Sequence, residues 1–460
     1  MASDGGLCPA RPVPQRLARL FSLTDSRSVA ARLSRATVRG GVVRDAARGV
    51  QWTAAWAAVL ALFCVPASAQ VAPPIQGVTT AVPALTLAGT ITQLVKPVGA
   101  PHAGEALGLA TALEVANSPF GAGPSAAGFL IKLDPSTGLQ VRAATTFGPF
   151  FSENALTSGE GGVSVGVNFM SATYDRLGDL DVNALPLRSV TARSLKDGGS
   201  GTANLALTAN TLVVSSRIGV TDKLDVGVTL PIVTVKLNGT SSLVNGIGDM
   251  TLFATGNGVA SGLGDVAGLV KYRIHGFGSG LPDPGGLAVM ATMRLPTGDH
   301  DNLRGLGVTR TLVSLIASGG ERRFRPHADV GFEYWSKGLG VTSDTAPNTV
   351  ITARHQFAYA AGLEFEAAPK ATLLVDLLGR QILGGGKLAV TADQSLAPGV
   401  ISSESLVALP EGISKLTLAP GMKVNLKSKL ILSVNVLIAL HDTGLHARVT
   451  PVAGIELALK

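Results

Sequence analysis

The chain has 460 residues, of which 46% are apolar and 15% are charged. This composition excludes an intrinsically disordered protein and is unusual for a cytosolic one, and the length permits one large domain or two to three ordinary ones. Of the formal net charge of +7, +6 comes from positions 1–69, which hold nine arginines and three aspartates. The rest is close to neutral, which removes the main support for nucleic-acid binding.

The first predicted element is a signal peptide over positions 1–69. The stretch "QWTAAWAAVLALFCVPASAQ" ends with a small-residue cleavage pattern at Ala67-Ser68-Ala69, and its apolar run is too short to cross a membrane. We expect cleavage after Ala69 and export through the inner membrane of a Gram-negative bacterium. The basic leader is atypically long, and an organellar transit peptide is the alternative.

The two segments that follow have less regular patterns. Residues 70–126 are rich in Pro, Ala and Gly, which predicts a loosely ordered periplasmic stretch. Residues 127–160 contain a hairpin pattern with an Asp-Pro-Ser-Thr-Gly turn. The stretch that follows, "FGPFFSENALTSGEGG", holds the densest group of aromatic residues. We predict a hairpin or a lumen plug for this segment.

From residue 161 to 460, apolar and polar residues alternate with period two, which indicates β-strands exposed to different surroundings on their two faces. Twelve segments show the pattern, and each of them reaches or exceeds the ~9–11 residues that a tilted strand needs to cross a bilayer. They are about 161–175, 204–219, 223–237, 264–275, 286–296, 308–318, 325–335, 354–366, 371–382, 413–426, 429–441 and 446–459.

The connections between these segments alternate between long and short. Outer-membrane barrels have short periplasmic turns and longer external loops, with an even number of strands. The pattern therefore predicts an all-β fold, a transmembrane antiparallel up-and-down β-barrel of about 12 strands over 161–460. The hairpin at 128–147 could raise the number to 14. The stretch 247–256 has some strand character, and we interpret it as part of an external loop.

The stretch "MRLPTGDHDNLRGLGVTRT" (293–311) contains the densest group of possible ligands. Asp299, His300, Asp301 and Asn302 could bind a divalent cation, but adjacent ligands in one loop need partners from elsewhere. Asp, Asn, Gly and Pro are also the residues that turns require. We interpret the stretch as a hydrated external loop tip.

Both cysteines lie within 1–69, and the seven histidines show no metal-ligand spacing. We therefore expect no metal site, no cofactor and no catalytic residue.

Three quoted stretches resemble one family. "GLGDVAGLVKYRI" (262–274), "LAVMATMRLPTGDHDNLRGLG" (287–307) and "HADVGFEYW" (327–335) are similar to the outer-membrane transporter family named for the meta-pathway of phenol degradation. The resemblance implies a β-barrel that acts as a channel or transporter for small hydrophobic or aromatic compounds. It also implies two partners, outer-membrane lipid and the barrel assembly machinery.

If the apolar positions face lipid, their polar neighbours face the lumen. The candidate residues for lining the lumen or forming a substrate track are Lys271, Arg273, Arg294, Arg310, Asp329, Glu333, Glu364, Asp376 and Arg380. They could equally be structural ion pairs, because both signs of charge are interspersed.

The function predicted from the sequence is a passive outer-membrane channel or transporter and not an enzyme. A structural or adhesive barrel is the alternative. An outer-membrane hydrolase is a weaker alternative, because it needs an acid–histidine group at a rim. Residues of that kind in the predicted loops are Asp299, His300, Asp301, His441, Asp442 and His446.

Overall fold

The computed structural model describes residues 86–95, 102–119, 131–133, 138, 140–190, 198–244, 250–278, 280–342, 350–393, 403–427 and 429–459. The predicted signal peptide and its cleavage after Ala69 lie outside these residues and stay predictions. Among the described residues, no helix is long and apolar enough to span a membrane.

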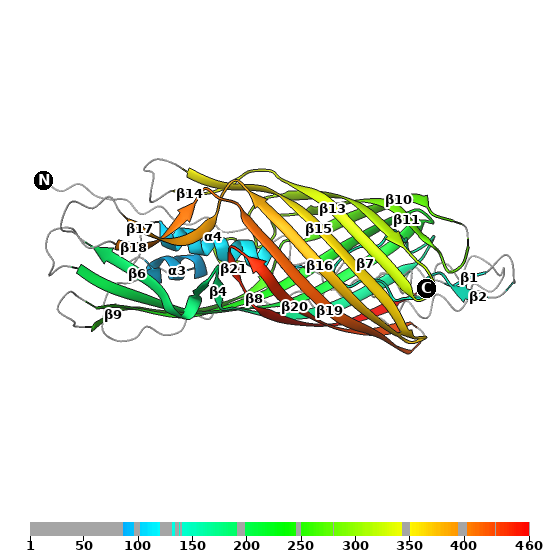
Figure 1. The fold of residues 1–460 in the computed structure, drawn as a ribbon, viewed down its shortest axis with the longest axis horizontal. Helices are drawn as coiled ribbons and strands as arrows, with labels where there is room; N and C mark the ends of the chain where they lie inside the picture. Colours follow the sequence, from blue (N-terminus) through cyan, green and yellow to red (C-terminus); the bar gives the residue numbers. More distant parts are fainter. Residues whose placement is uncertain are drawn as a thin grey trace, which may run out of the picture. The chain divides into compact units, whose positions relative to one another are not determined.

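Twelve antiparallel strands form a closed barrel (Figure 1). The second and third of these strands pair with each other as well as with their other neighbours, and this pairing closes the circle. The strands are β3 (Val163–Tyr174), β7 (Gly198–Thr221), β8 (Leu224–Val244), β10 (Ala267–Gly276), β11 (Gly285–Arg294), β12 (Arg310–Gly319), β13 (Phe324–Trp335), β15 (Val350–Ala368), β16 (Ala371–Leu383), β19 (Ile413–Lys427), β20 (Leu430–Asp442) and β22 (Val449–Ala458). The predicted fold and each of the twelve predicted segments are confirmed.

The two ends of the barrel differ. We call the end with the short connections, such as 320–323 and 369–370, the turn end, and the opposite end the loop end. Further elements extend the loop end: β4 (Arg176–Leu177), β5 (Leu180–Asp181), η3 (Val182–Ala184), β6 (Leu185–Val190), β9 (Met250–Leu263), β14 (Leu339–Thr342), β17 (Lys387–Asp393), β18 (Ser403–Leu409) and β21 (Leu445–His446).

One loop prediction is wrong. The stretch 247–256 was expected within a loop, yet most of it belongs to strand β9. β9 pairs with β8 only from Ile232 upward, whereas β10 pairs with β8 from Leu224 to Thr229. The two strands thus share one neighbour at different heights, so β9 adds to the sheet without entering the closed wall.

The hairpin of β1 (Ile131–Leu133) and β2 (Gln140–Arg142) also stays outside the wall. Its two strands pair with each other, and the fifteen-stranded sheet that contains the barrel does not include them. The 14-strand alternative is therefore wrong.

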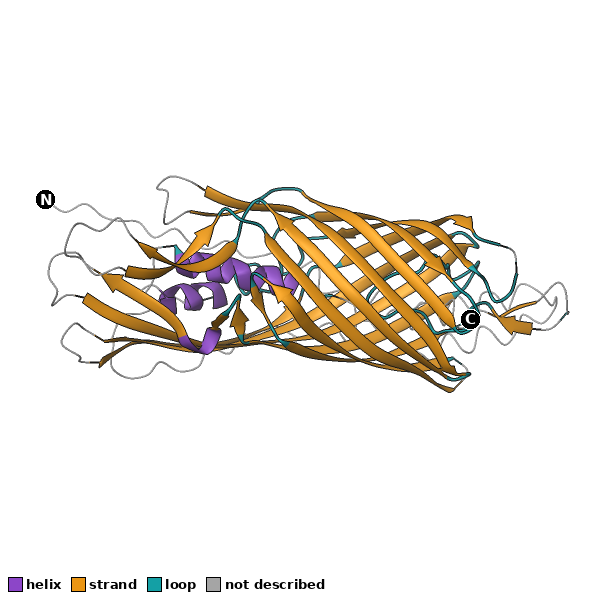
Figure 2. Cartoon of the chain, in the orientation of Figure 1, coloured by secondary structure: helices purple, strands orange, loops and turns teal. Residues whose placement is uncertain are grey.

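Two helices, α3 (Leu87–Val95) and α4 (Ala103–Ala116), occupy the loop end, where the prediction for 70–126 was a loosely ordered stretch (Figure 2). Leu87, Ile91 and Leu94 recur at helical spacing and are buried. They belong to the same apolar cluster as Leu205 and Leu237 on the inner face of β7 and β8. The prediction for 70–126 rested on its content of Pro, Ala and Gly and did not use this helical spacing.

Glycines on β8 and β9 let α3 approach the sheet closely. A Cβ atom at Gly256 would lie 2.6 Å from Cγ2 of Thr90, and one at Gly239 would lie 2.5 Å from a methyl carbon of Leu94. Glycine is therefore required there because a helix passes, and not because of a turn.

The outer surface changes from apolar to polar at one level of the sheet. On β7 the outward residues change between Leu212 and Asn210, and on β8 between Ile232 and Thr234. Leu212 pairs with Ile232, and Asn210 pairs with Thr234, so the two borders coincide. Above this level, hydroxyl and amide groups bond across strands, as between Ser171 and Asn210 at 2.7 Å.

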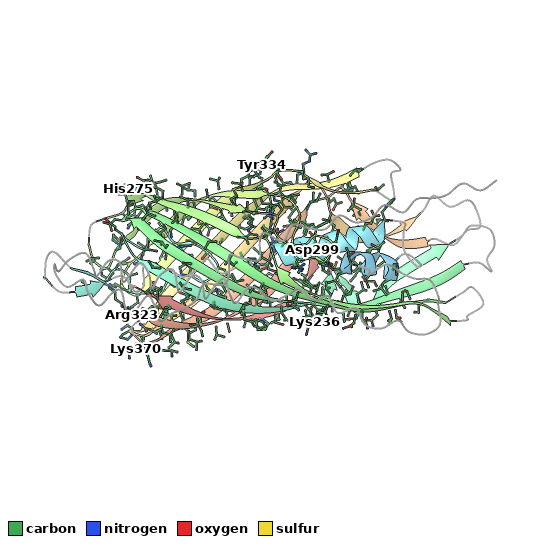
Figure 3. The ribbon with its side chains drawn as sticks, turned by 180° about the vertical axis from the view of Figure 1, so that it is seen from behind. Lys236, His275, Asp299, Arg323, Tyr334 and Lys370 are labelled. Atoms are coloured by element: carbon green, nitrogen blue, oxygen red, sulfur yellow. The ribbon has the colours of Figure 1, made fainter. Side chains whose placement is uncertain are left out.

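Outward aromatic side chains mark two heights on the wall. Phe324 packs on Phe365 near the turn end, while Tyr334 stacks on His355 further along. Figure 3 shows His275, Arg323 and Lys370 at the turn end and Tyr334 well beyond them. Ten residues of tilted strand separate Phe324 from Tyr334, which corresponds to a height of about 25 Å, close to the apolar band of outer-membrane barrels.

We predict that Val228→Arg impairs folding into micelles or vesicles much more than Asn238→Arg. Both side chains point outward from β8, Val228 below the apolar–polar border and Asn238 above it. Arginine in the middle of the apolar band costs ~2–4 kcal/mol, and this cost falls to about 0–1 kcal/mol near its edge. Folded yields are measured by heat-dependent gel mobility, and equal yields for the two variants would contradict the position of the border.

Candidate functional site

A non-helical segment, residues 143–162, fills the lumen from the turn end; we call it the plug. At its start, Asp283 donates its backbone N–H to the carbonyl oxygen of Ala143 near the turn end. At its other end, the backbone N–H of Ser158 donates to the carboxylate of Asp225 at 3.0 Å. The segment therefore enters and leaves through the same end, directly before β3. Of the two forms expected for 127–160, the structure has a short hairpin followed by this plug.

Inward side chains of the wall bind the backbone of the plug. Asp376 accepts hydrogen bonds from the N–H of Phe151 and from the hydroxyl of Ser152, at 3.2 and 2.8 Å. On the neighbouring side, the N–H of Ala155 donates to Oγ of Ser318 at 3.0 Å. These contacts satisfy backbone groups that a coil would otherwise leave unpaired in a closed lumen.

The strongest electrostatic contact of the plug is formed by Glu153. Its carboxylate receives a guanidinium N–H of Arg217 at 2.5 Å and the ammonium of Lys271 at 3.2 Å. All three side chains are nearly inaccessible to solvent, at 8%, 3% and 1% exposure. In such surroundings each charge depends on the others, because an unpaired buried charge is costly.

A second buried group lies beside the plug. Nε2 of His327 is 2.7 Å from Oδ1 of Asp376, and its Nδ1 is 3.6 Å from Glu364. Asp376 thus holds the plug and the histidine together. The residues come from β13, β15 and β16, which are neighbours in the wall.

At the loop end, the last turn of α4 meets a group of cations from the wall. Arg310 donates to the carbonyl oxygen of Ala116 at 3.2 Å and to Oδ1 of Asn117 at 2.6 Å. Arg294 donates to the same carbonyl of Ala116 at 3.1 Å, and Arg380 donates to the carbonyl of Asn117. The carbonyl end of a helix carries partial negative charge, so arginines stabilise it.

Carboxylates balance part of this positive charge. Arg310 lies 3.3 Å from Asp265 and 3.6 Å from Glu333, and Glu333 also accepts the indole N–H of Trp335 at 2.7 Å. Lys415 forms an ion pair with Glu114 of α4.

Between the end of α4 and the tip of the plug lies a chamber of about 270 Å³. α4 and the residues after it provide one boundary and the plug another, while the wall supplies the sides. Apolar lining residues include Phe151, Met170, Met290, Leu312, Leu378 and Leu437, and polar lining residues include Glu114, Asn117, Glu153, Arg294, Asp329, Glu333, Gln356, Arg380 and Lys415.

The structure places the nine predicted lumen residues in separate groups. Arg294, Asp329, Glu333 and Arg380 line the chamber. The buried residues of the set that pair elsewhere in the lumen are Lys271 on Glu153, Arg310 on Asp265, and Glu364 and Asp376 beside His327. Arg273 lies at the turn end, where it binds both oxygens of Asp283. Whether the set acts as a substrate track stays a prediction.

Sequence reasoning did not select Glu114, Asn117, Glu153 or His327 as site residues. For His327 the signal was present, because it occupies an inward position of β13 in the same register as Asp329. The other three lie in segments that were not predicted as strands, so alternation could not place them in the lumen.

The stretch 299–302 forms part of the β11–β12 connection. Asp299 accepts hydrogen bonds from Asn302 and from Arg304, and Leu87 and Ala88 at the start of α3 donate to Asn302 and Asp301. Burial alone would raise the pKa of Asp299, but the hydrogen bonds from Asn302 and the nearby Arg304 hold it below its usual value. This connection therefore caps a helix.

Comparisons with known proteins give structural likenesses alone. No family model matches the chain, and no curated protein matches it. The chain is similar to the crystal structure of an outer-membrane channel from Pseudomonas putida F1, at 10% identity and a TM-score of 0.41, over 66% of this chain and 98% of that one. It is also similar to a toluene transporter of Ralstonia pickettii, at 15% identity and a TM-score of 0.34, over 74% of this chain and 99% of that one.

We predict that Glu153→Ala strongly destabilises the protein, by about 3–5 kcal/mol, because it leaves Arg217 and Lys271 buried without their shared partner. Urea unfolding in detergent measures the change. Glu160→Ala is the matched control, since Glu160 lies in the same segment and is exposed. Indistinguishable midpoints for the two variants would show that the buried ion pairs do not hold the plug.

Proposed function

We propose that this protein is a passive channel or transporter for small hydrophobic or aromatic compounds in the outer membrane of a Gram-negative bacterium. The observation that carries the proposal is a chamber of about 270 Å³, with apolar side chains among its lining, inside a closed barrel whose outer surface has an apolar band of membrane height.

The barrel has a size that suits a chamber. Eight-stranded barrels are filled by their own side chains, and sixteen-stranded porins leave an open aqueous pore. Twelve strands leave a lumen between these limits. Here the plug and α4 occupy part of it, and the chamber remains between them.

The lining indicates the size and chemistry of the solute. Pockets for drug-sized ligands have volumes of ~300–1,000 Å³ and are mostly apolar with a few polar groups. A chamber of about 270 Å³ fits a smaller molecule. Met170, Met290 and Leu437 would contact its apolar body.

Passage requires that the plug moves. It fills the lumen at the turn end, where polar contacts and the packing of Phe150 and Phe151 against the wall hold it. Polar contacts can be exchanged for water when the segment shifts, so a mobile plug is compatible with a rigid barrel.

A structural or adhesive barrel is the second candidate. It is favoured by the strands of β7, β8 and β9 that continue past the apolar band, with outward hydroxyl and amide side chains such as Thr234, Asn238 and Ser261. Solute flux separates the candidates, because an adhesive barrel needs none.

We predict that a disulfide between the plug and the wall stops solute uptake. Ala155→Cys with Ser318→Cys places two thiols where the backbone of one residue already contacts the side chain of the other. Both native cysteines lie within 1–69, so the new pair has no competing thiol in a chain cleaved there. Uptake of cyclohexylmethanol into proteoliposomes should fall at least fivefold on oxidation and return on reduction.

Each single-cysteine variant serves as a control and should respond to neither treatment. If vesicles that contain the native protein take up no more solute than empty vesicles do, this result would contradict the channel function.

A further inference from the structure

We propose that the chamber binds an organic carboxylate, with the anionic head group beneath the end of α4 and the apolar body against the wall. This inference deepens the proposed channel function and rests on it for the entry of solutes into the chamber. The head group would be bound by Arg294 and Arg380.

The first support is the distribution of charge in the chamber lining. Three lining carboxylates have cationic partners within the protein: Glu114 pairs with Lys415, Glu333 lies next to Arg310, and Glu153 pairs with Arg217 and Lys271. Asp329 accepts the backbone N–H of Glu153 at 3.3 Å. The acidic groups of the lining are therefore already engaged.

The second support is the kind of acceptor that two lining arginines contact. Arg294 and Arg380 donate to the carbonyl oxygens of Ala116 and Asn117, which carry only the partial charge of a helix end. A guanidinium has five N–H donors and matches a carboxylate with two of them. For Arg380, a carboxylate would therefore be a better-matched acceptor than the single carbonyl oxygen of Asn117.

The third support is a buried donor without a partner. Asn117 is 4% exposed and lines the chamber, and its side-chain nitrogen donates to no acceptor among the described residues. Such a group costs free energy unless a bound molecule accepts its hydrogen bond. A carboxylate oxygen is an acceptor of this kind.

The apolar residues of the chamber select the rest of the ligand. Leu378 is on the same strand as Arg380, two residues away and on the same face, and Met290 and Thr292 precede Arg294 on β11 in the same way. The head group and the apolar surface are therefore adjacent, which suits a compact acid such as cyclohexanecarboxylate.

Tryptophan fluorescence can report binding. Trp335 is the only tryptophan after residue 69, it is 1% exposed, and its N–H bonds to the chamber residue Glu333. We would titrate the purified protein in detergent with cyclohexanecarboxylate and with its neutral isostere cyclohexylmethanol. The native protein should bind the acid at least tenfold more tightly.

Arg380→Gln and, separately, Arg294→Gln should weaken binding of the acid about tenfold and change binding of the alcohol less than twofold. Arg380→Lys keeps the charge without the paired N–H donors, so it should weaken binding of the acid less than Arg380→Gln does. The control is Arg448→Gln, because Arg448 pairs with Asp175 outside the chamber and is 63% exposed. It should leave both affinities unchanged.

Equal affinity of the native protein for the acid and the alcohol would overturn the proposal. An equal loss of affinity for both compounds in the glutamine variants would also overturn it. Vesicle uptake distinguishes failure of the carboxylate proposal from failure of the channel function. Acid-selective binding without uptake of either compound would support the carboxylate site while contradicting transport.

Discussion

The structure depends on one constraint: every backbone N–H and C=O group inside the hydrocarbon layer needs a partner within the protein. A sheet meets this condition only when it has no free edge. Here the hairpin β7–β8 provides the closure, because β7 also pairs with β3 and β8 also pairs with β10. Free edges remain on β6, β9 and β14, all at the loop end, where water can satisfy them.

Closure fixes the direction of each side chain and hence much of what the sequence could predict. Along β20, Val434 is 49% exposed and Asn435 is 1% exposed, as their alternation predicted. Alternation also predicted the number of strands, their approximate bounds and the inward position of residues such as Arg310 and Asp376. These features follow from a two-residue repeat that is visible in one strand at a time.

The contents of the lumen follow from contacts between residues far apart in the chain, and no local pattern contains them. Glu153 is one of many acidic residues until the fold brings Arg217 and Lys271 to it. The helices gave a local signal at Leu87, Ile91 and Leu94, but the surrounding Pro, Ala and Gly favoured a loop interpretation. β9 was missed for a different reason, since a strand outside the closed wall does not obey the alternation of turns and loops.

The two elements that bound the chamber bury different amounts of apolar surface, and this difference decides which of them moves at the lower cost. α3 and α4 bury a continuous apolar surface that includes Ile91, Leu107 and Leu113, and each such side chain contributes ~1.5–3 kcal/mol that water cannot replace. The plug buries fewer apolar side chains, among them Phe150 and Phe151, and is also held by hydrogen bonds and by the ion pairs of Glu153. A path that opens at the turn end therefore exposes less apolar surface than one that opens past the helices. In the proposed channel, solutes would therefore exchange with the turn end through movement of the plug, while α4 keeps its place next to Arg294 and Arg380.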